Sequence, residues 1–322
     1  MTSNESKTGI WKKLLVITGL VLVGTMIAGV GILARKVESN SSATTVSQAT
    51  YRSPENAAAA LAQAAKSGDP NALVPVLGGQ AKALITTGDY ASDKAAMDAF
   101  VSKYRQMNRW VDMTDGTRVL YIGADNFAFP VPLAKNSSGQ WYFDGVAGAE
   151  EIRAREIGRN ELLAIDACIA FANAEELYFA SSNSPEYTRR IISTTGKQDG
   201  LYWPAPDAHT SSPLGHLSKF PKTSLASYSP DQPFVIDGYS LRILPAQGQD
   251  APGGAASYIV NGKMTGGFAV LATPVKYAET GIMTFMISRD GMVYEQDLGP
   301  DTTKITTALQ EYNPDENWSL VE

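Results

Sequence analysis

Residues that commonly act as metal ligands or nucleophiles are sparse in this chain. It contains two histidines, His209 and His216, and one cysteine, Cys168. A zinc site needs three or four ligands, and the two histidines, in a Pro/Ser-rich stretch, supply only two. A single cysteine excludes an internal disulfide and any zinc site built from several cysteines. We therefore expect no metal site, no cofactor and a structural role for Cys168 in an apolar helix face.

Sequence motifs of common enzymes are also absent. The chain has no Gly-x-Ser-x-Gly elbow, no His-Glu-x-x-His pair, no Walker loop and no dinucleotide-binding fingerprint. Gly266-Gly267 follows Gly262-Lys263 in the wrong order for a phosphate-binding loop. The acidic pairs at 150–151 and 175–176 point about 100° apart on a helix, so we expect them on solvated faces. No catalytic residue is assigned, and a hydrolase with an unrecognised site is the alternative.

Three aromatic residues form the candidate binding surface. Tyr202 and Trp203 follow the turn at 197–200, and Tyr239 begins a predicted strand. If their rings meet at one rim of the sheet, they provide faces suited to a sugar or a partner chain. The alternative is that Trp203 fills the core beneath its loop.

The elements that position these residues follow a candidate membrane anchor. Residues 14–33 are twenty consecutive residues without a charge. A helix of that length spans about 30 Å, the thickness of a bilayer's hydrocarbon core. The run is long for a secretory signal, although cleavage near Ala43 is an alternative to an uncleaved signal anchor. Basic residues are slightly more numerous before the span, which predicts a cytoplasmic N-terminus at residues 1–13.

The composition after the span limits the partners. Residues 34–50 are rich in Ser and Thr and predict a solvated stalk. From residue 39 onward, 22 basic residues stand against 31 acidic ones, a formal charge of −9. Because nucleic-acid binding requires a basic surface, we expect no nucleic-acid partner. A protein or an envelope polysaccharide is the expected partner, and the oligomeric state is left open.

The remaining chain predicts two α+β domains. In the first, residues 51–148, capping signals at Ser53-Pro54 and Asp69-Pro70 start two helices, and a third begins near Asp93. Strands are expected at 117–122, 127–133 and 140–144. Pro130 and Pro132 cannot donate ladder bonds, which makes the middle strand an edge or bulged strand. This order of elements resembles the cone-shaped domains related to nuclear transport factor two.

The second domain, residues 149–322, combines helices with an antiparallel meander. A short helix at 149–157 is expected to end at Gly158, and Asn160 is expected to cap a helix at 161–181. That helix carries an apolar stripe at 163, 167, 170, 171, 174, 177 and 178. Strands are predicted at 239–244, 257–260, 263–265, 268–273, 282–287 and 292–295, with tight turns at Asn261-Gly262 and Asp290-Gly291. A closing helix runs from Pro300 to Asn313, and Trp318 packs the tail against the core.

Three segments resemble a known family. The family they resemble is the bacterial domain-of-unknown-function family 2950. The segments are GRNELLAIDACIAFANAEELYFASS (158–182), TTGKQDGLYWP (194–204) and GGFAVLATPVKYAETGIMTFMISRDGMVYEQDLGPD (266–301). The resemblance covers nearly the whole chain after the stalk. It implies little about function, because the family is named for its lack of one.

A second resemblance concerns the fold of the C-terminal domain. The order of a helix, a variable loop and a sheet that ends in a hairpin resembles type IV pilin and pseudopilin headgroups. The residues that match are Asn160-Glu161 at the helix, and Thr284-Phe285 and Asp290-Gly291 at the hairpin. The prepilin peptidase site has a Glu five residues after its Gly, whereas here Leu14 stands five residues after Gly9. The resemblance therefore implies the headgroup fold without assembly into a pilus. The sequence as a whole predicts a noncatalytic cell-envelope module, tethered through residues 14–33 with its bulk on the periplasmic side.

The predicted topology has a direct test. A reporter enzyme that is active only outside the cytoplasm, fused after Glu322, should be active in cells, because the slight basic excess lies before the span. A fusion of the same reporter after residue 13 serves as the control and should be inactive. Activity of a cytoplasm-restricted reporter at Glu322 would contradict the predicted orientation.

Overall fold

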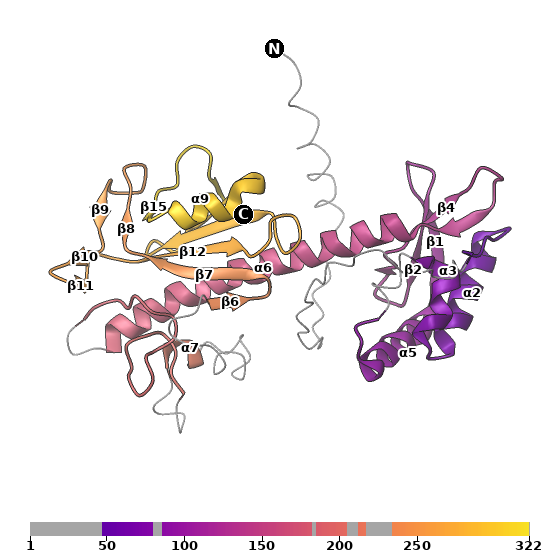
Figure 1. The fold of residues 1–322 in the computed structure, drawn as a ribbon, viewed down its shortest axis with the longest axis horizontal. Helices are drawn as coiled ribbons and strands as arrows, with labels where there is room; N and C mark the ends of the chain where they lie inside the picture. Colours follow the sequence, from indigo (N-terminus) through magenta and orange to yellow (C-terminus); the bar gives the residue numbers. More distant parts are fainter. Residues whose placement is uncertain (1–46, 80–85, 182–184, 205–211, 217–233, 322) are drawn as a thin grey trace, which may run out of the picture. The chain divides into compact units, whose positions relative to one another are not determined.

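The computed structural model describes residues 47–79, 86–181, 185–204, 212–216 and 234–321. They divide into two compact units, of which unit 1 ends at Ile152 and unit 2 begins at Arg153. Each unit has its own hydrophobic core (Figure 1). Both units combine helices with sheets that are almost entirely antiparallel, so the predicted α+β class is confirmed.

Capping side chains set where the helices of unit 1 begin. Its helices are α2 (Pro54–Lys66), the 3-10 helix η1 (Pro70–Leu73), α3 (Val74–Leu77) and α5 (Tyr90–Gln106). As expected, Ser53 caps α2 and Asp69 caps η1 by accepting hydrogen bonds from backbone N–H groups in the first turn. The third helix, α5, begins three residues before the expected position, because Asp89 and not a later residue is its N-cap.

The helices of unit 1 pack on one curved sheet. Its strands are β1 (Asn108–Asp112), β2 (Arg118–Ile122), β3 (Phe127–Ala128), β4 (Leu133–Lys135) and β5 (Trp141–Phe143), in the order β1-β2-β4-β5 with β3 paired to β2. The single strand expected at 127–133 is divided in two, because Pro130 and Pro132 interrupt it. The edge strand β1 was not predicted. Leu120, Leu133 and Phe143 are fully buried in the core of this unit.

One long helix, α6 (Gly145–Ser181), replaces the two helices expected at 149–157 and 161–181. The prediction that Gly158 ends a helix is wrong. Glycine within a helix costs only about 1 kcal/mol relative to alanine, and strong helix formers flank it on both sides. Asn160 is therefore inside the helix and is not its cap; its Nδ2 donates a hydrogen bond to the carbonyl of Thr280 at 3.0 Å.

A six-stranded antiparallel sheet forms the centre of unit 2. Its strands are β6 (Phe234–Ile236), β7 (Tyr239–Leu244), β12 (Ala269–Pro274), β13 (Met283–Ser288), β14 (Val293–Asp297) and β16 (Ser319–Leu320), in the order β16-β14-β13-β12-β7-β6. Four predicted strands are thus present in this sheet as β7, β12, β13 and β14, and β7 has the predicted bounds. The strands predicted at 257–260 and 263–265 are not part of it.

Two smaller groups of strands lie beyond this sheet. β8 (Ala246–Gln247) pairs with β9 (Ala256–Ser257) and β15 (Glu311–Tyr312), while β10 (Ile259–Val260) pairs with β11 (Lys263–Met264). The closing helix expected up to residue 313 ends earlier. It consists of η4 (Gly299–Asp301) and α9 (Thr302–Ala308), because the chain leaves the helix to pair β15 in parallel with β8. Trp318 packs partly buried against the core, as predicted.

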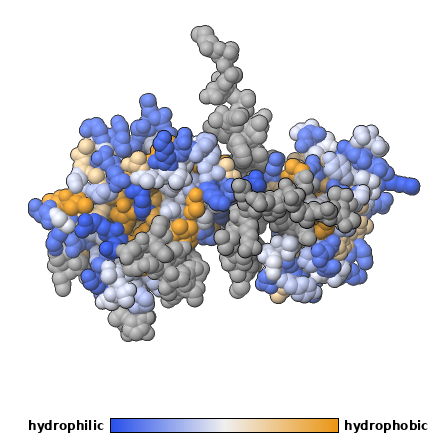
Figure 2. Space-filling view, viewed as in Figure 1, coloured by the Kyte–Doolittle hydropathy of each residue, from blue (hydrophilic) through white to orange (hydrophobic). Residues whose placement is uncertain are grey.

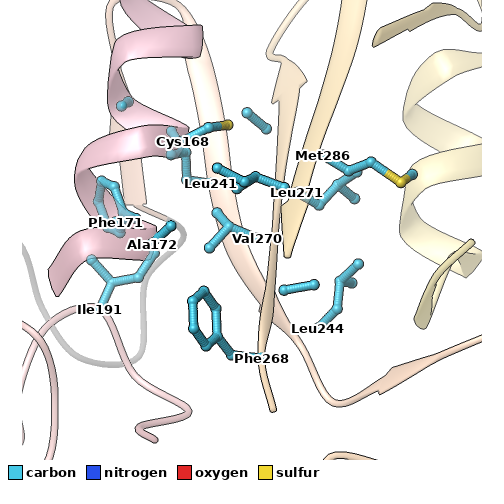
Figure 3. Close-up of a cluster of buried hydrophobic side chains, with 14 of the residues drawn as sticks. Cys168, Phe171, Ala172, Ile191, Leu241, Leu244, Phe268, Val270, Leu271 and Met286 are labelled. Carbon is cyan, nitrogen blue, oxygen red and sulfur yellow. The ribbon is translucent and has the colours of Figure 1, made fainter. Parts of the chain in front are cut away.

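Both faces of the six-stranded sheet are covered. Figure 3 shows Cys168 and Phe171 of α6 pointing toward one face, with Leu241. On the opposite face, Leu271 and Met286 point toward the side where α9 lies against β12. Neighbouring strand residues alternate between the two faces, so β12 and β13 are each buried at all positions but one.

The apolar stripe of α6 is rotated relative to the prediction. Its buried positions are Ala164, Ala167, Cys168, Ala170, Phe171, Ala172 and Ala174, which share a face of mostly small side chains. Leu163 is only half-buried and Leu177 is 46% exposed, so both lie beside the stripe and not in it. Small side chains let the helix backbone approach the sheet closely, whereas a leucine in that face would hold it away. Glu161 fixes the helix to β13 by accepting hydrogen bonds from the N–H groups of Ile282 and Met283.

Several predicted features lie outside the described residues. These are residues 1–13, the span at 14–33, most of the stalk at 34–50, and His209. Among the helices described, none has the length and apolarity needed to cross a bilayer. Within the long connection after Trp203, the described part is a short helix, α7 (Pro213–His216). Hydrophilic residues cover much of the face in Figure 2, with hydrophobic ones gathered toward the middle of unit 2.

The packing of α6 on the sheet predicts a large effect of truncating its central ring. Phe171 is fully buried, so Phe171→Ala should reduce the free energy of unfolding by about 3–5 kcal/mol. Leu177→Ala, on the same helix but exposed, should change it by no more than about 0.5 kcal/mol. Denaturant unfolding of both variants measures the difference. Equal stability of the two variants would show that the stripe is wrongly placed.

Candidate functional site

A pocket of about 320 Å³ at one end of the six-stranded sheet is the candidate functional site, and we call it the sheet-end pocket. Six segments supply its walls. They are Gln247 of β8, Pro252 between β8 and β9, Tyr258 after β9, Gly266 to Phe268 before β12, Ser288 to Asp290 at the end of β13, and Tyr312 of β15. Three of these segments are turns or strand ends, where side chains and backbone groups are available to a ligand.

Strand register brings these segments together. Ala269, the first residue of β12, lies opposite Ser288, the last residue of β13, so the Gly266–Phe268 segment lies beside the turn after β13. Gln247 pairs with Tyr312 on one side and with Ala256 on the other. The small sheet β15-β8-β9 therefore forms one wall, and the hairpin end of the large sheet forms the other (Figure 1).

A half-buried arginine holds the wall that carries Tyr312. Arg242 of β7 donates from Nη2 to the carbonyl of Thr306 at 2.6 Å and to the carbonyl of Leu309. These carbonyls belong to the last turn of α9 and to the residue that ends it, where backbone acceptors lack helical partners. Burial lowers the pKa of Arg242. The bonds fix the end of α9 and hence the start of β15.

Gly267 allows the ring of Tyr258 to form part of the pocket. Its φ of +146° is one that residues with a side chain rarely adopt, and a Cβ there would lie 2.9 Å from the ring of Tyr258. The hydroxyl of Tyr258 donates to Oε1 of Gln247 at 3.0 Å. Nε2 of Gln247 in turn donates to the carbonyls of Pro252 and Gly254, at 2.9 and 2.7 Å. This wall is fully hydrogen-bonded and therefore rigid.

Tyr312 differs from Tyr258 in its hydrogen bonding. It is 1% exposed, and its hydroxyl has no hydrogen-bond partner of normal geometry in the part of the chain that the structure describes. Burial raises the pKa of Tyr312, and a hydrogen bond with the Ser288 side chain acts in the opposite direction. The hydroxyl is closed off from solvent, so it belongs to the packed wall and not to the open surface of the pocket.

Arg289 is positioned at the pocket by helix α6. Its Nε donates to Oε1 of Glu176 at 3.2 Å, and its guanidinium lies 5.9 Å from the ring centroid of Tyr187. The hydroxyl of Tyr187 donates to the same carboxylate oxygen at 3.0 Å. The ring of Tyr187 also contacts Phe268, with ring centroids 4.9 Å apart. Glu176 thus links the helix to both the rim and the floor of the pocket.

The two phenols that line the pocket have raised pKa values. Burial, followed by the charge of Asp290, raises the pKa of Tyr258 to about 12, and the pKa of Tyr312 is also raised. Both phenols are therefore neutral near pH 7 and serve as hydrogen-bonding groups. The pocket lining contains no histidine, cysteine or lysine.

Glu175 is the acidic residue whose predicted position is wrong. The sequence predicts a solvated face, but the side chain is 0% exposed. Its Oε2 accepts a hydrogen bond from the N–H of Thr188 at 3.0 Å, and its Oε1 has no partner among the described residues. Burial raises the pKa of Glu175 well above its ordinary value. The segment 185–204, which periodicity on the helix cannot reveal, covers this position.

The aromatic residues predicted to bind a ligand are not brought together at an exposed rim. Tyr239 is 0% exposed, and its hydroxyl donates to the carbonyl of Met283 at 2.8 Å. Tyr202 is also buried, and its backbone pairs with Ile191. Trp203, in the same segment, is half-buried. Tyr239 is in the core because it begins a central strand whose two faces are both covered.

The other chemically reactive residues do not form a site in the described part of the chain. Cys168 is fully buried, as expected, and burial raises the pKa of its thiol to about 12. It is therefore a thiol and not a nucleophilic thiolate at neutral pH. Across the described ranges, no three His, Cys, Asp or Glu side chains are grouped closely enough to hold a metal ion.

The residues of the sheet-end pocket carry only weak signals in the sequence. Gly266-Gly267 and Asp290-Gly291 are recognisable as turns, yet nothing local shows that they lie side by side. Gln247, Tyr258 and Tyr312 belong to no motif, and they are far apart in sequence. One signal could have located the pocket. Gly266-Gly267 directly precedes a buried strand, and such a glycine pair permits another side chain to pack closely against the backbone.

Comparison with known proteins adds one finding. The family model described as "Protein of unknown function (DUF2950)" matches residues 48–321. No curated protein and no solved structure matches the chain significantly.

The burial of Glu175 predicts a specific pH dependence of stability. Because its pKa is raised in the folded state, the folded protein holds this proton more tightly than the unfolded chain does. The stabilisation that comes from this tighter proton binding is fully present below the unfolded-state pKa of about 4.3. It is lost as the pH rises through the higher folded-state pKa. The stability of the wild type relative to Glu175→Gln should therefore fall with rising pH.

Urea unfolding at a series of pH values measures this difference. Glu311→Gln, at an exposed position, is the control and should give a nearly pH-independent difference. The opposite result would contradict the prediction. If the wild type gains stability relative to Glu175→Gln as the pH rises from about 4 to neutrality, Glu175 is ionised in the folded protein.

Proposed function

The chain belongs to the DUF2950 family, and from this premise we propose that it is a noncatalytic module of the cell envelope that binds a protein partner or an envelope polymer through the sheet-end pocket. The observation that carries this proposal is the composition of the pocket. Its walls provide hydrogen-bonding and aromatic groups, and its lining contains no histidine, cysteine or lysine. A rigid, partly apolar hollow with a few fixed polar groups is typical of a binding site.

The proposed location rests on the N-terminal sequence. Residues 14–33 are long and apolar enough for a transmembrane signal anchor, and residues 34–50 have the composition of a stalk. In this proposal, residues 1–13 are cytoplasmic, and the domains at 51–148 and 149–322 lie on the periplasmic side of the cytoplasmic membrane. The pocket then faces the compartment that contains the envelope polymers.

The finer description of the fold is part of the same proposal. Helices followed by a curved sheet in unit 1 support a cone-like domain, and α6 packed on an antiparallel meander supports a pilin-headgroup-like domain in unit 2. The sequence lacks the peptidase site required for pilus assembly, so we carry over the headgroup fold alone. A hydrolase is not favoured, because Glu175, the described acidic residue with the most strongly raised pKa, is buried away from the pocket lining.

Photo-crosslinking in living cells tests this proposal. A photoreactive amino acid at position 289, on the pocket rim, should capture an envelope protein or polymer on the full-length chain. The same amino acid at position 304, which is exposed on α9 and does not line the pocket, is the matched control. Position 289 should give at least about five times the crosslinked product, since a site-specific contact exceeds random collision. Equal labelling at both positions, or none at either, would refute a binding function of the pocket.

A further inference from the structure

An exposed ridge runs along α6 on the side of the helix opposite its buried alanine face. Five side chains form it, three or four residues apart and within about 80° of one another around the helix axis. They are Leu162, Asp166, Ile169, Asn173 and Leu177, and all five are exposed. We call them the outer ridge. Because the other face of α6 packs on the sheet, the outer ridge is the part of the helix that a further element can cover.

The apolar content of the outer ridge sets it apart from the rest of unit 2. Leu162 is 68% exposed, Ile169 41% and Leu177 46%. Elsewhere in the unit, exposed aliphatic side chains lie on separate elements, as Val260 does on β10 and Ile305 on α9. Single exposed apolar side chains are ordinary on a protein surface. Three of them seven and eight residues apart on one helix are typical of a seam between two helices.

The residues of the outer ridge are arranged symmetrically along the helix. Leu162 lies as far before the point between residues 169 and 170 as Leu177 lies after it, and the same holds for Asp166 and Asn173. A second copy of α6 that runs antiparallel therefore places leucine against leucine and Asp166 against Asn173, each of them twice. The two Ile169 side chains then lie beside each other at the centre. A twofold interface requires this self-complementarity.

The polar pair selects the antiparallel arrangement. The amide of Asn173 carries two N–H donors, whereas an ionised carboxylate only accepts hydrogen bonds. Asp166 has several lone pairs, so it can accept this amide in addition to its interactions within its own chain. A parallel pair of helices would instead bring the two Asp166 carboxylates together, and such like-charge contacts are unfavourable.

The size of the contact indicates a weak dimer. Residues 162–177 extend over about 24 Å of helix. One helix pair of that length covers less than the about 800 Å² per partner of a standard interface. The expected association is therefore reversible. No other partner is needed to explain the outer ridge, because each of its side chains is matched by one from the same sequence.

We infer that two copies of this chain associate through their outer ridges, with the α6 helices antiparallel and a twofold axis near residues 169 and 170. None of the ridge residues lines the sheet-end pocket. The inference therefore goes beyond the proposed function and does not depend on it.

Sedimentation equilibrium of the full-length chain in detergent tests the association. The wild type should dimerise with a dissociation constant on the order of 10–100 µM. Ile169→Glu should weaken the dimer at least about tenfold, because it places two like charges side by side at the centre. Ile305→Glu is the matched control: the same residue type, 40% exposed against 41%, on another helix. It should leave the dissociation constant within about twofold.

Cysteine crosslinking tests the orientation without a disruptive charge. Leu162→Cys and Leu177→Cys are prepared separately, mixed and treated with a short bismaleimide; wild type gives the background, since Cys168 is fully buried. In an antiparallel pair these two positions are neighbours, whereas the two copies of residue 162 are about 22 Å apart along the helix axis. The mixture should therefore give crosslinked dimer, and either variant alone should give little.

Three results would overturn the inference. The first is a wild type that stays monomeric at about 0.5 mM, which would mean that another segment of the chain or a different partner covers the outer ridge. The second is a dimer that persists in Ile169→Glu, which would be held elsewhere, for example through residues 14–33. The third is efficient crosslinking of Leu162→Cys to itself, which would show a parallel arrangement. Melting curves of Ile169→Glu and Ile305→Glu at low concentration should coincide, which separates lost association from lost folding.

Discussion

The packing of α6 against the six-stranded sheet is the interaction on which unit 2 depends. The buried face of the helix is built almost entirely from alanines, with Cys168 and Phe171 as its larger members. These small side chains bring the helix backbone close to the sheet, and Phe171 fills the space beside Phe234 of the edge strand. Glu161 and Asn160 add hydrogen bonds to the chain around Thr280 and Ile282, which fixes the position of the helix along the strands.

The same helix determines where charged side chains lie near the pocket. Once the alanine face is buried, Glu175 is turned toward the segment 185–204 and Glu176 toward Arg289. Two adjacent acidic residues therefore have different roles. Glu175 lies in the core with a raised pKa, and Glu176 orients a guanidinium at the pocket rim. Burial decides between these roles, because an ionised carboxylate is stable only where water or a cation compensates its charge.

The opposite face of the sheet provides the second wall of the pocket. Arg242 is held under α9 by carbonyls at the end of that helix, and the chain then turns into β15 to place Tyr312 beside Gln247. A glycine with positive φ at 267 lets Tyr258 approach from the other side. The resulting hollow is lined by polar groups from several segments, and the proposed binding function rests on them.

The sequence by itself determined the local features whose cause is local. Capping residues such as Ser53 and Asp69 marked helix starts, strand-like runs predicted β7 and β13, and Asn261-Gly262 and Asp290-Gly291 marked hairpins. Family membership was also recognisable, because it rests on the order of residues alone.

Only the tertiary structure decided the features that depend on contacts between distant segments. Helix α6 continues through Gly158 because the cost of a single glycine is small against the helix-forming residues on both sides. Glu175 is buried because another segment covers it, and Tyr239 is buried because both faces of its sheet are covered. The sheet-end pocket was not predictable from sequence, since Gln247, Gly267, Arg289 and Tyr312 meet only through strand register, which no single stretch of sequence encodes.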